Sequence, residues 1–206
     1  MSSREPLLKP VPIASLRPTQ ITVGYREVAQ KRRGWRGKSD DKGALFLGSH
    51  MIPVLMGPKE RPYVIDHHHL VRALLDEGVE DILVNVVADL RALSRDEFWV
   101  LADNHGWCHP YDAAGQRREF ADIPASIAGL KDDPFRSLAG ALRRAGGFAK
   151  DTTPFSEFIW ADFLRRRIAG KAVADDFDSA LANALVLARS ETAGHLPGWC
   201  GPIPAA

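Results

Sequence analysis

The sequence predicts a mixed α/β fold of the α+β kind, with a small core of sheet and helices followed by an all-helical C-terminal half. β-branched segments such as "ILVNVVADL" alternate with helical patterns up to about residue 93, and only helical patterns follow. The chain of 206 residues is long enough for one sizeable domain, or for a core with a helical extension. We therefore expect residues 1–93 to form the core and residues 94–206 to pack on it as helices.

The expected core contains strands and two helices. The strands lie near residues 12–16, 51–56, 62–66 and 82–88, where short apolar runs are bounded by Pro and Gly. The first helix covers "YREVAQKRRGW". The second runs from His67 to Glu77, with apolar residues at helical spacing, and it ends at Gly78 because glycine is a common residue after a helix.

The second half shows a series of helical patterns separated by Gly and Pro. The first, "SRDEFWVLADNHG", begins with a capping box formed by Ser94 and Glu97. The others cover residues 112–120, 132–147, 153–170 and 175–191. We expect these helices to bury their apolar faces against one another and against the core.

Composition narrows the class of protein. Hydrophobic residues make up 45% of the chain and charged residues 26%, and the net charge is +1, so any basic surface for nucleic acid must be local. Cys108 and Cys200 do not form a disulfide framework. The N-terminus has no signal-peptide pattern, and no segment approaches the roughly 20 apolar residues of a membrane span. We expect a cytoplasmic protein without a membrane partner, and the sequence leaves its oligomeric state open.

A run of histidines stands where a strand passes directly into a helix, in "VIDHHHL". The first N–H groups of a helix have no partner within the helix and carry the positive end of its dipole, so they attract anions. We therefore expect Asp66, His67, His68 and His69 to form a phosphate site. Two alternatives are a purely structural junction and a metal site. Three consecutive helix residues point about 100° apart, so they cannot all bind one metal ion.

This segment resembles the second signature of the ParB/sulfiredoxin superfamily, in which a strand, an Asp-Gly-His-His-Arg or similar motif, a helix and a strand follow one another. The upstream "PIASLRPTQITVGYREVAQK" resembles the first signature. The chain is most similar to the ParB-like nuclease family. The resemblance covers residues 11–90 well and the helical half more loosely. It implies a ParB/sulfiredoxin-like core whose strand–helix junction binds phosphate, and relatives use that pocket for nucleotide hydrolysis, phosphotransfer, sulfinic-acid repair or DNA binding.

Carried over by position, Asp66 takes the acidic place of the motif, and His68 and His69 take its two histidine places. His67 stands where the motif often has Gly, and Leu70 where it often has Arg, so a bidentate phosphate donor is missing. No cysteine stands in the motif, which argues against sulfinic-acid repair.

Other residues are candidates for the same pocket. Thr19 and Gln20 follow the first Leu-Arg-Pro, and Glu27 on the next helix is a candidate general base. If Mg²⁺ or Mn²⁺ takes part, Asp66 and Glu27 are its expected ligands. Lys38 lies in a polar segment that we expect to close over a phosphate.

The loop "DNHGWCHPYD" places His105, Cys108 and His109 between two helices. We interpret these residues first as a structural turn, and second as side chains that line the pocket opposite His68, because clustered polar side chains in a loop suggest function. Two histidines and one cysteine without a fourth ligand are weak support for zinc.

Three functions remain open from the sequence. The first is an enzyme acting on a phosphate-bearing substrate, either a nuclease (phosphoester hydrolase) or a nucleotide-dependent phosphotransferase. The second is a non-catalytic DNA-binding module of the partition type, and the third is a regulatory domain that binds a small anion. We favour the first, with catalytic roles for Asp66, His68, His69 and Glu27 and a nucleotide or nucleic acid as partner.

Overall fold

The computed structural model describes residues 10–38, 43 and 46–202. Its strands are β1 (Pro10–Pro12), β2 (Arg17–Pro18), β3 (Thr22–Val23), β4 (Ile52–Gly57), β5 (Arg61–Val64), β6 (Asp81–Asp89) and β7 (Lys131–Asp132). Its α-helices are α1 (Tyr25–Arg36), α3 (His68–Asp76), α4 (Arg95–Asn104), α5 (Pro134–Arg144), α6 (Ser156–Arg165), α7 (Gly170–Asp175) and α8 (Phe177–Ala188). Short 3₁₀ helices are η1 (Ile13–Ser15), η2 (Pro58–Glu60), η3 (Phe120–Asp122), η4 (Ile127–Gly129) and η5 (Glu191–Ala193). The α+β class is confirmed.

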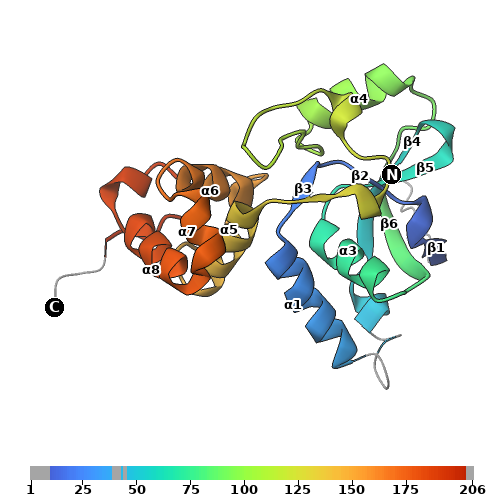
Figure 1. Ribbon diagram of the computed structural model, residues 1–206. Helices are drawn as coiled ribbons and strands as arrows, with labels where there is room; N and C mark the ends of the chain where they lie inside the picture. The colour runs from blue at the N-terminus through green and yellow to red at the C-terminus, as the bar shows by residue number, and fades with distance from the viewer. Residues whose placement is uncertain (1–9, 39–42, 44–45, 203–206) are drawn as a thin grey trace.

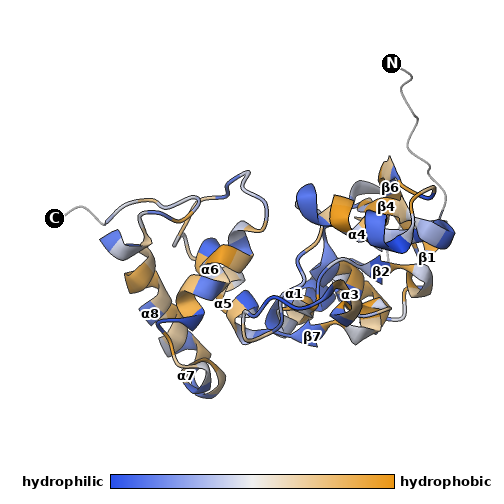
Figure 2. Ribbon diagram, turned by 90° about the horizontal axis from the view of Figure 1, so that it is seen from above, coloured by the Kyte–Doolittle hydropathy of each residue, from blue (hydrophilic) through white to orange (hydrophobic). Residues whose placement is uncertain are grey.

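Figure 1 shows two parts side by side. The larger sheet with α1, α3 and α4 forms one part, and α5 to α8 form the other, toward the C-terminus. The view from above in Figure 2 shows the same separation. The parts meet where β3 and β7 pair in parallel, close to the starts of α1 and α5. Among the described residues, no helix has the length and apolar character needed to cross a bilayer.

The larger sheet has the strand order β1-β6-β4-β5-β2. β4 is parallel to β6 and antiparallel to β5, while β2 is parallel to β5. The expected strands near 51–56, 62–66 and 82–88 are confirmed. The one near 12–16 is wrong beyond Pro12, because the chain there turns as η1, which buries Ile13 at its start and Leu16 just after it.

Helices α1 and α3 pack together against one face of this sheet. α3 contributes Leu70, Val71 and Leu74 to a core shared with Ile52 and Val64. Its end is set by Gly78, whose φ of 75° lies in the left-handed region that favours glycine. The helix expected from His67 to Glu77 is therefore confirmed to within one residue at each end.

The middle of the chain packs with the sheet. α4 begins with the expected capping box, in which Ser94 and Glu97 bond each other's backbone. Phe98 and Trp99 then pack on Leu55 and Tyr63 of the sheet. Residues 112–120 were expected to be helical and are not, since they form tight turns held by the carboxylate of Asp112. Apolar side chains of this middle segment up to Leu130 cluster with those of the sheet part, and those from Phe135 onward form a separate cluster.

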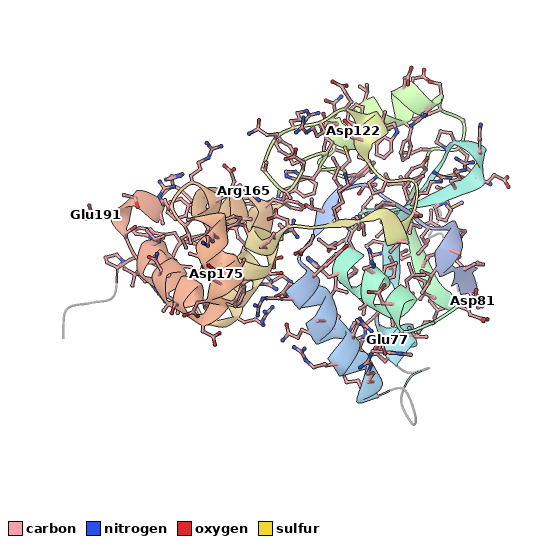
Figure 3. All side chains as sticks on the ribbon, viewed as in Figure 1. Glu77, Asp81, Asp122, Arg165, Asp175 and Glu191 are labelled. Carbon is pink, nitrogen blue, oxygen red and sulfur yellow. The ribbon has the colours of Figure 1, made fainter. Side chains whose placement is uncertain are left out.

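The last part is a bundle of α5, α6, α7 and α8 around the fully buried Trp160 and Leu138. α5 begins directly after β7. Its first turn is capped by the buried carboxylate of Asp133, which accepts from the Phe135 N–H at 3.0 Å. Arg165, labelled in Figure 3, reaches from α6 to the same carboxylate at 2.6 Å. These contacts fix the start of α5 beside the sheet.

Candidate functional site

The passage from β5 into α3 has the geometry of an anion site. His67 precedes the helix in the left-handed conformation, with φ 65°, which explains why a glycine is common at this place in related motifs. Asp66 accepts from the His67 N–H at 2.6 Å, and both residues are exposed. Within the described part of the chain, the N–H groups of His68, His69 and Leu70 have no hydrogen-bond partner. Solvent or a ligand must therefore satisfy these donors.

His68 is buried in this junction, and its ring makes two hydrogen bonds. Nε2 accepts from the Thr19 N–H at 3.3 Å, and a further hydrogen bond joins the ring to the backbone of Val64. Burial lowers the pKa of His68 to about 3, so the ring is neutral at pH 7. The expectation that His68 binds phosphate as a charged donor does not agree with this environment.

His69, the next residue of α3, contacts the start of α1. Its Nε2 accepts from the Gly24 N–H at 3.0 Å, so the neutral ring carries its proton on Nδ1. Burial, with the positive charge of Arg136 next, holds the pKa of His69 well below its usual range. In the described residues Nδ1 has no hydrogen-bond partner and remains available as a donor.

His109 from the central loop completes a group of three histidine rings. The backbone N–H of His109 donates to the Thr19 carbonyl at 2.8 Å, and the centroid of its ring lies 4.0 Å from that of Phe158. Burial lowers the pKa of His109 to about 3. Thr19 and Gln20, both expected to bind substrate, instead hold this region together: Thr19 Oγ1 donates to the Val64 carbonyl and Gln20 Nε2 to the Thr22 carbonyl.

Arg136 in the first turn of α5 is the cation of this region. Its positive charge lowers the pKa of His68, His69 and His109, which places it near all three rings. Only 4% of Arg136 is exposed, and within the described residues its Nε and Nη1 have no hydrogen-bond partner. The nearest carboxylate, Glu157, is 3.9 Å from Nη2, too far for a hydrogen bond.

The guanidinium of Arg136 lies flat against Phe158, with 3.3 Å between its central carbon and the ring centroid. This cation–π contact is its closest described interaction. Burial lowers the pKa of Arg136 to about 10, so it remains charged at pH 7. The region therefore has one buried cation, three neutral histidines and the free donors of α3.

Two other predicted residues are occupied elsewhere. Both carboxylate oxygens of Glu27 accept from Arg144, an ion pair that joins α1 to α5. Lys38 follows the far end of α1, where its ammonium lies 4.9 Å from the Phe46 ring. The 12-residue helix α1 starts at the junction and rises roughly 18 Å along its axis, so the structure does not bring Lys38 to the histidines. The neighbouring residues 39–42, expected to close over the phosphate, lie outside the described residues.

The rest of the central loop shows no reactive group. Burial and the nearby Asp103 carboxylate raise the pKa of Cys108 to about 12, which keeps it a thiol. His105 is exposed and stacks on Trp107. In the part of the chain that the structure describes, no three His, Cys, Asp or Glu side chains are grouped to hold a metal ion. Asp66 is the predicted metal ligand that remains free of an ion pair there.

The sequence reasoning missed Arg136. A signal was present, because a cation in the first turn of a helix opposes the helix dipole. Its neighbours Phe135 and Leu138 belong to the apolar face, so Arg136 looked like an ordinary charge beside that face. Only the packing of α5 with α1 and α6 shows that it is buried.

Comparison with known proteins identifies a family and a similar solved structure. The family described as "Putative ParB-like nuclease" matches residues 9–166. The crystal structure of protein Atu1540 from Agrobacterium tumefaciens is similar over 97% of this chain and 99% of its own, with 57% identity and a TM-score of 0.91. No curated protein matches. The family match includes the histidine junction, Arg136 and Phe158.

Proposed function

This chain belongs to the ParB-like nuclease family, and on that basis we propose that it binds a nucleic-acid phosphodiester between β5, α3 and α5 and hydrolyses it. The observation that supports binding is the buried guanidinium of Arg136. A fold seldom keeps such a cation away from water without a partner. A phosphate could pair with Nε and Nη2, or with Nη1 and Nη2, because two oxygens of a phosphate match one edge of a guanidinium in a bidentate geometry.

The donors around Arg136 suit the same ligand. The free N–H groups at the start of α3 and the Nδ1–H of His69 present further hydrogen bonds to an anion. His68 and His109 are neutral and buried, so they shape the pocket without adding charge. In this proposal Arg136 replaces the arginine that the family motif often has at the position of Leu70.

Hydrolysis needs a group that activates water, and we assign this role to Asp66. Its carboxylate is exposed, and one oxygen accepts from the His67 N–H while the other has no described partner. A carboxylate at this place can accept a proton from water or hold a divalent cation against the phosphate. Glu27 is a weaker candidate because Arg144 engages both of its oxygens.

The test separates binding from cleavage. A fluorescein-labelled single-stranded DNA would be mixed with the protein at low salt, with EDTA, Mg²⁺ or Mn²⁺. Anisotropy would measure binding and denaturing gels would measure cleavage. We expect Asp66→Asn to retain binding and to lose cleavage, because the amide cannot take a proton from water. The matched control is Asp81→Asn, which changes an exposed acid at the start of β6, labelled in Figure 3.

The outcomes distinguish the three functions expected from the sequence. Binding with cleavage that Asp66→Asn removes supports the nuclease. Binding without cleavage under any of the three conditions would identify a DNA-binding module and overturn the hydrolytic part. A rise in melting temperature with inorganic phosphate, but no DNA binding, would identify a small-anion domain and overturn the nucleic-acid part.

A further inference from the structure

A cavity lies outside the histidine region, beside α4. Its volume is about 430 Å³, within the usual range for small-ligand sites. It is bounded by β2, η2, Arg61 and Tyr63 of β5, the first turns of α4 and residues 120–125. Figure 3 shows the label of Asp122 in this region beside α4. From Arg61 at the cavity, β5 extends roughly 10 Å to Val64 at the histidine junction.

The wall of this cavity is strongly basic. Arg17, Lys59, Arg61 and Arg95 line it, against the single acid Asp122. Within the described residues, none of the four cations has a carboxylate within 4.0 Å or any other hydrogen-bond partner for its side chain. Most arginines of this protein are paired, so four unpaired cations around one cavity indicate an anionic ligand.

The opposite wall is aromatic. Trp99 and Phe120 lie with their rings parallel, at a centroid distance of 5.7 Å and an angle of 10°. Trp99 is only 5% exposed, yet its Nε1–H has no hydrogen-bond partner in the part of the chain that the structure describes. A buried indole N–H normally finds an acceptor. The cavity therefore needs both an acceptor and negative charge, and it offers a flat surface for stacking.

The turn between β4 and β5 places the cation of Lys59 at the rim of the cavity. Lys59 and Glu60 both have positive φ, of 60° and 55°. Consecutive left-handed residues are typical of tight hairpin turns and usually require Gly, Asn or Asp. Keeping a lysine there costs stability, and the gain is that Lys59 lines the cavity.

We propose that this cavity binds one nucleotide unit, with its phosphate among Arg17, Lys59, Arg61 and Arg95 and its base against Phe120. Stacking on an aromatic ring and pairing with arginine are the contacts by which proteins hold nucleotides without reading their sequence. The unit is either a free nucleotide or a nucleotide of a strand, because both present the same chemistry. The site is separate from the proposed anion site and does not require Arg136.

The experiment measures binding of AMP and of a 5′-phosphorylated trinucleotide by calorimetry. Arg61→Gln and Phe120→Ala are compared with the control Arg91→Gln. Arg91 is a nearby surface arginine that is not among the cavity-lining residues and is paired with Asp89 at 2.7 Å. We expect Arg61→Gln to weaken binding by about ten- to a hundredfold and Phe120→Ala by about five- to a hundredfold. The control should bind as the wild type does.

The two ligands distinguish the source. AMP binding as tight as trinucleotide binding identifies a free nucleotide, and trinucleotide binding alone identifies a strand; either supports the proposal. Wild-type protein that binds neither ligand overturns it. So does unchanged affinity in both cavity variants with normal melting curves. Because Phe120→Ala removes part of a core contact, Arg61→Gln decides the matter if the former does not fold. Arg136→Met should leave this binding intact, so the two sites can fail independently.

Discussion

Replacing Arg136 with methionine should weaken anion binding while leaving the fold at least as stable. The change removes the guanidinium and keeps an unbranched apolar stem that can still pack on Phe158. Most substitutions of buried residues destabilise a protein. The opposite expectation here follows from the missing partners of this one side chain.

The magnitude can be worked from the structure. Burial lowers the pKa of Arg136 from 12.5 to about 10, and at about 1.4 kcal/mol per pKa unit the charged form costs the fold on the order of 3 kcal/mol at pH 7. The contact with Phe158 returns up to about 2 kcal/mol. Losing both the cost of the buried charge and the contact with Phe158 raises the free energy of unfolding by roughly 1 kcal/mol. For a chain of this size, that is a rise in melting temperature of about 2–4 °C.

The same substitution should weaken binding of the ligand. Loss of charge-assisted hydrogen bonds to a phosphate, worth about 1.5–3 kcal/mol, should weaken binding by about ten- to a hundredfold. Anisotropy with labelled single-stranded DNA measures the affinity and calorimetry measures the stability. The control is Arg143→Met on the same helix, which removes an arginine that is 37% exposed and lies 3.1 Å from Glu157. That variant should bind normally.

One combination of results would refute this reasoning. If Arg136→Met lowers the melting temperature by many degrees and the affinity of the folded fraction is unchanged, Arg136 is a structural partner of Phe158. Arg136→Lys then serves as a second check. A lysine keeps the charge without the planar fork, so under the proposal it should bind DNA more weakly than wild type and more strongly than the methionine variant.

Three further outcomes follow from the same contacts. DNA binding should stay flat between pH 5.5 and 8, because the pKa of His68 lies at about 3; an affinity that falls through pH 6.5 would mean a charged histidine binds the phosphate. In the native protein, iodoacetamide at pH 8 should modify the exposed Cys200 and not the buried Cys108, because the pKa of Cys108 is raised to about 12. Mass spectrometry identifies the modified cysteine. Hydrogen bonds from Arg36 and Arg32 lower the pKa of Glu77 from 4.5 to about 2, so its contribution to stability is present above pH 4.5 and is lost as pH falls toward 2; Glu77→Gln should flatten that part of the acid melting profile.

Local sequence patterns located the core and the junction because both depend on neighbours along the chain. The strand before Asp66, the helix after it and the stop at Gly78 are all set by residues within a few positions. The left-handed residue before α3 also agrees with the Gly of related motifs. These features required no knowledge of distant contacts.

The chemistry of the histidines could not be read from the sequence. Whether His68 is charged depends mainly on its burial, which comes from segments far away in the sequence such as the one holding Thr19, 49 positions earlier. Glu27 looked free as a base because its partner Arg144 stands 117 positions later. Residues 112–120 were predicted wrongly for a related reason. Their composition is helical, but the Asp112 carboxylate accepts hydrogen bonds from nearby backbone N–H groups, and these bonds compete with those of a helix. Long-range packing and side-chain competition decided each case.

The distance along the chain between α3 and α5 also sets an order of events during synthesis. The donors of α3 emerge from the ribosome first, and Arg136 and Phe158 follow 67 and 89 residues after His69. At roughly 5–20 residues per second, this interval lasts several seconds. A nascent chain therefore has the histidine junction before it has the buried cation. If Arg136 is needed for binding, the nascent chain cannot hold nucleic acid before α5 has been synthesised.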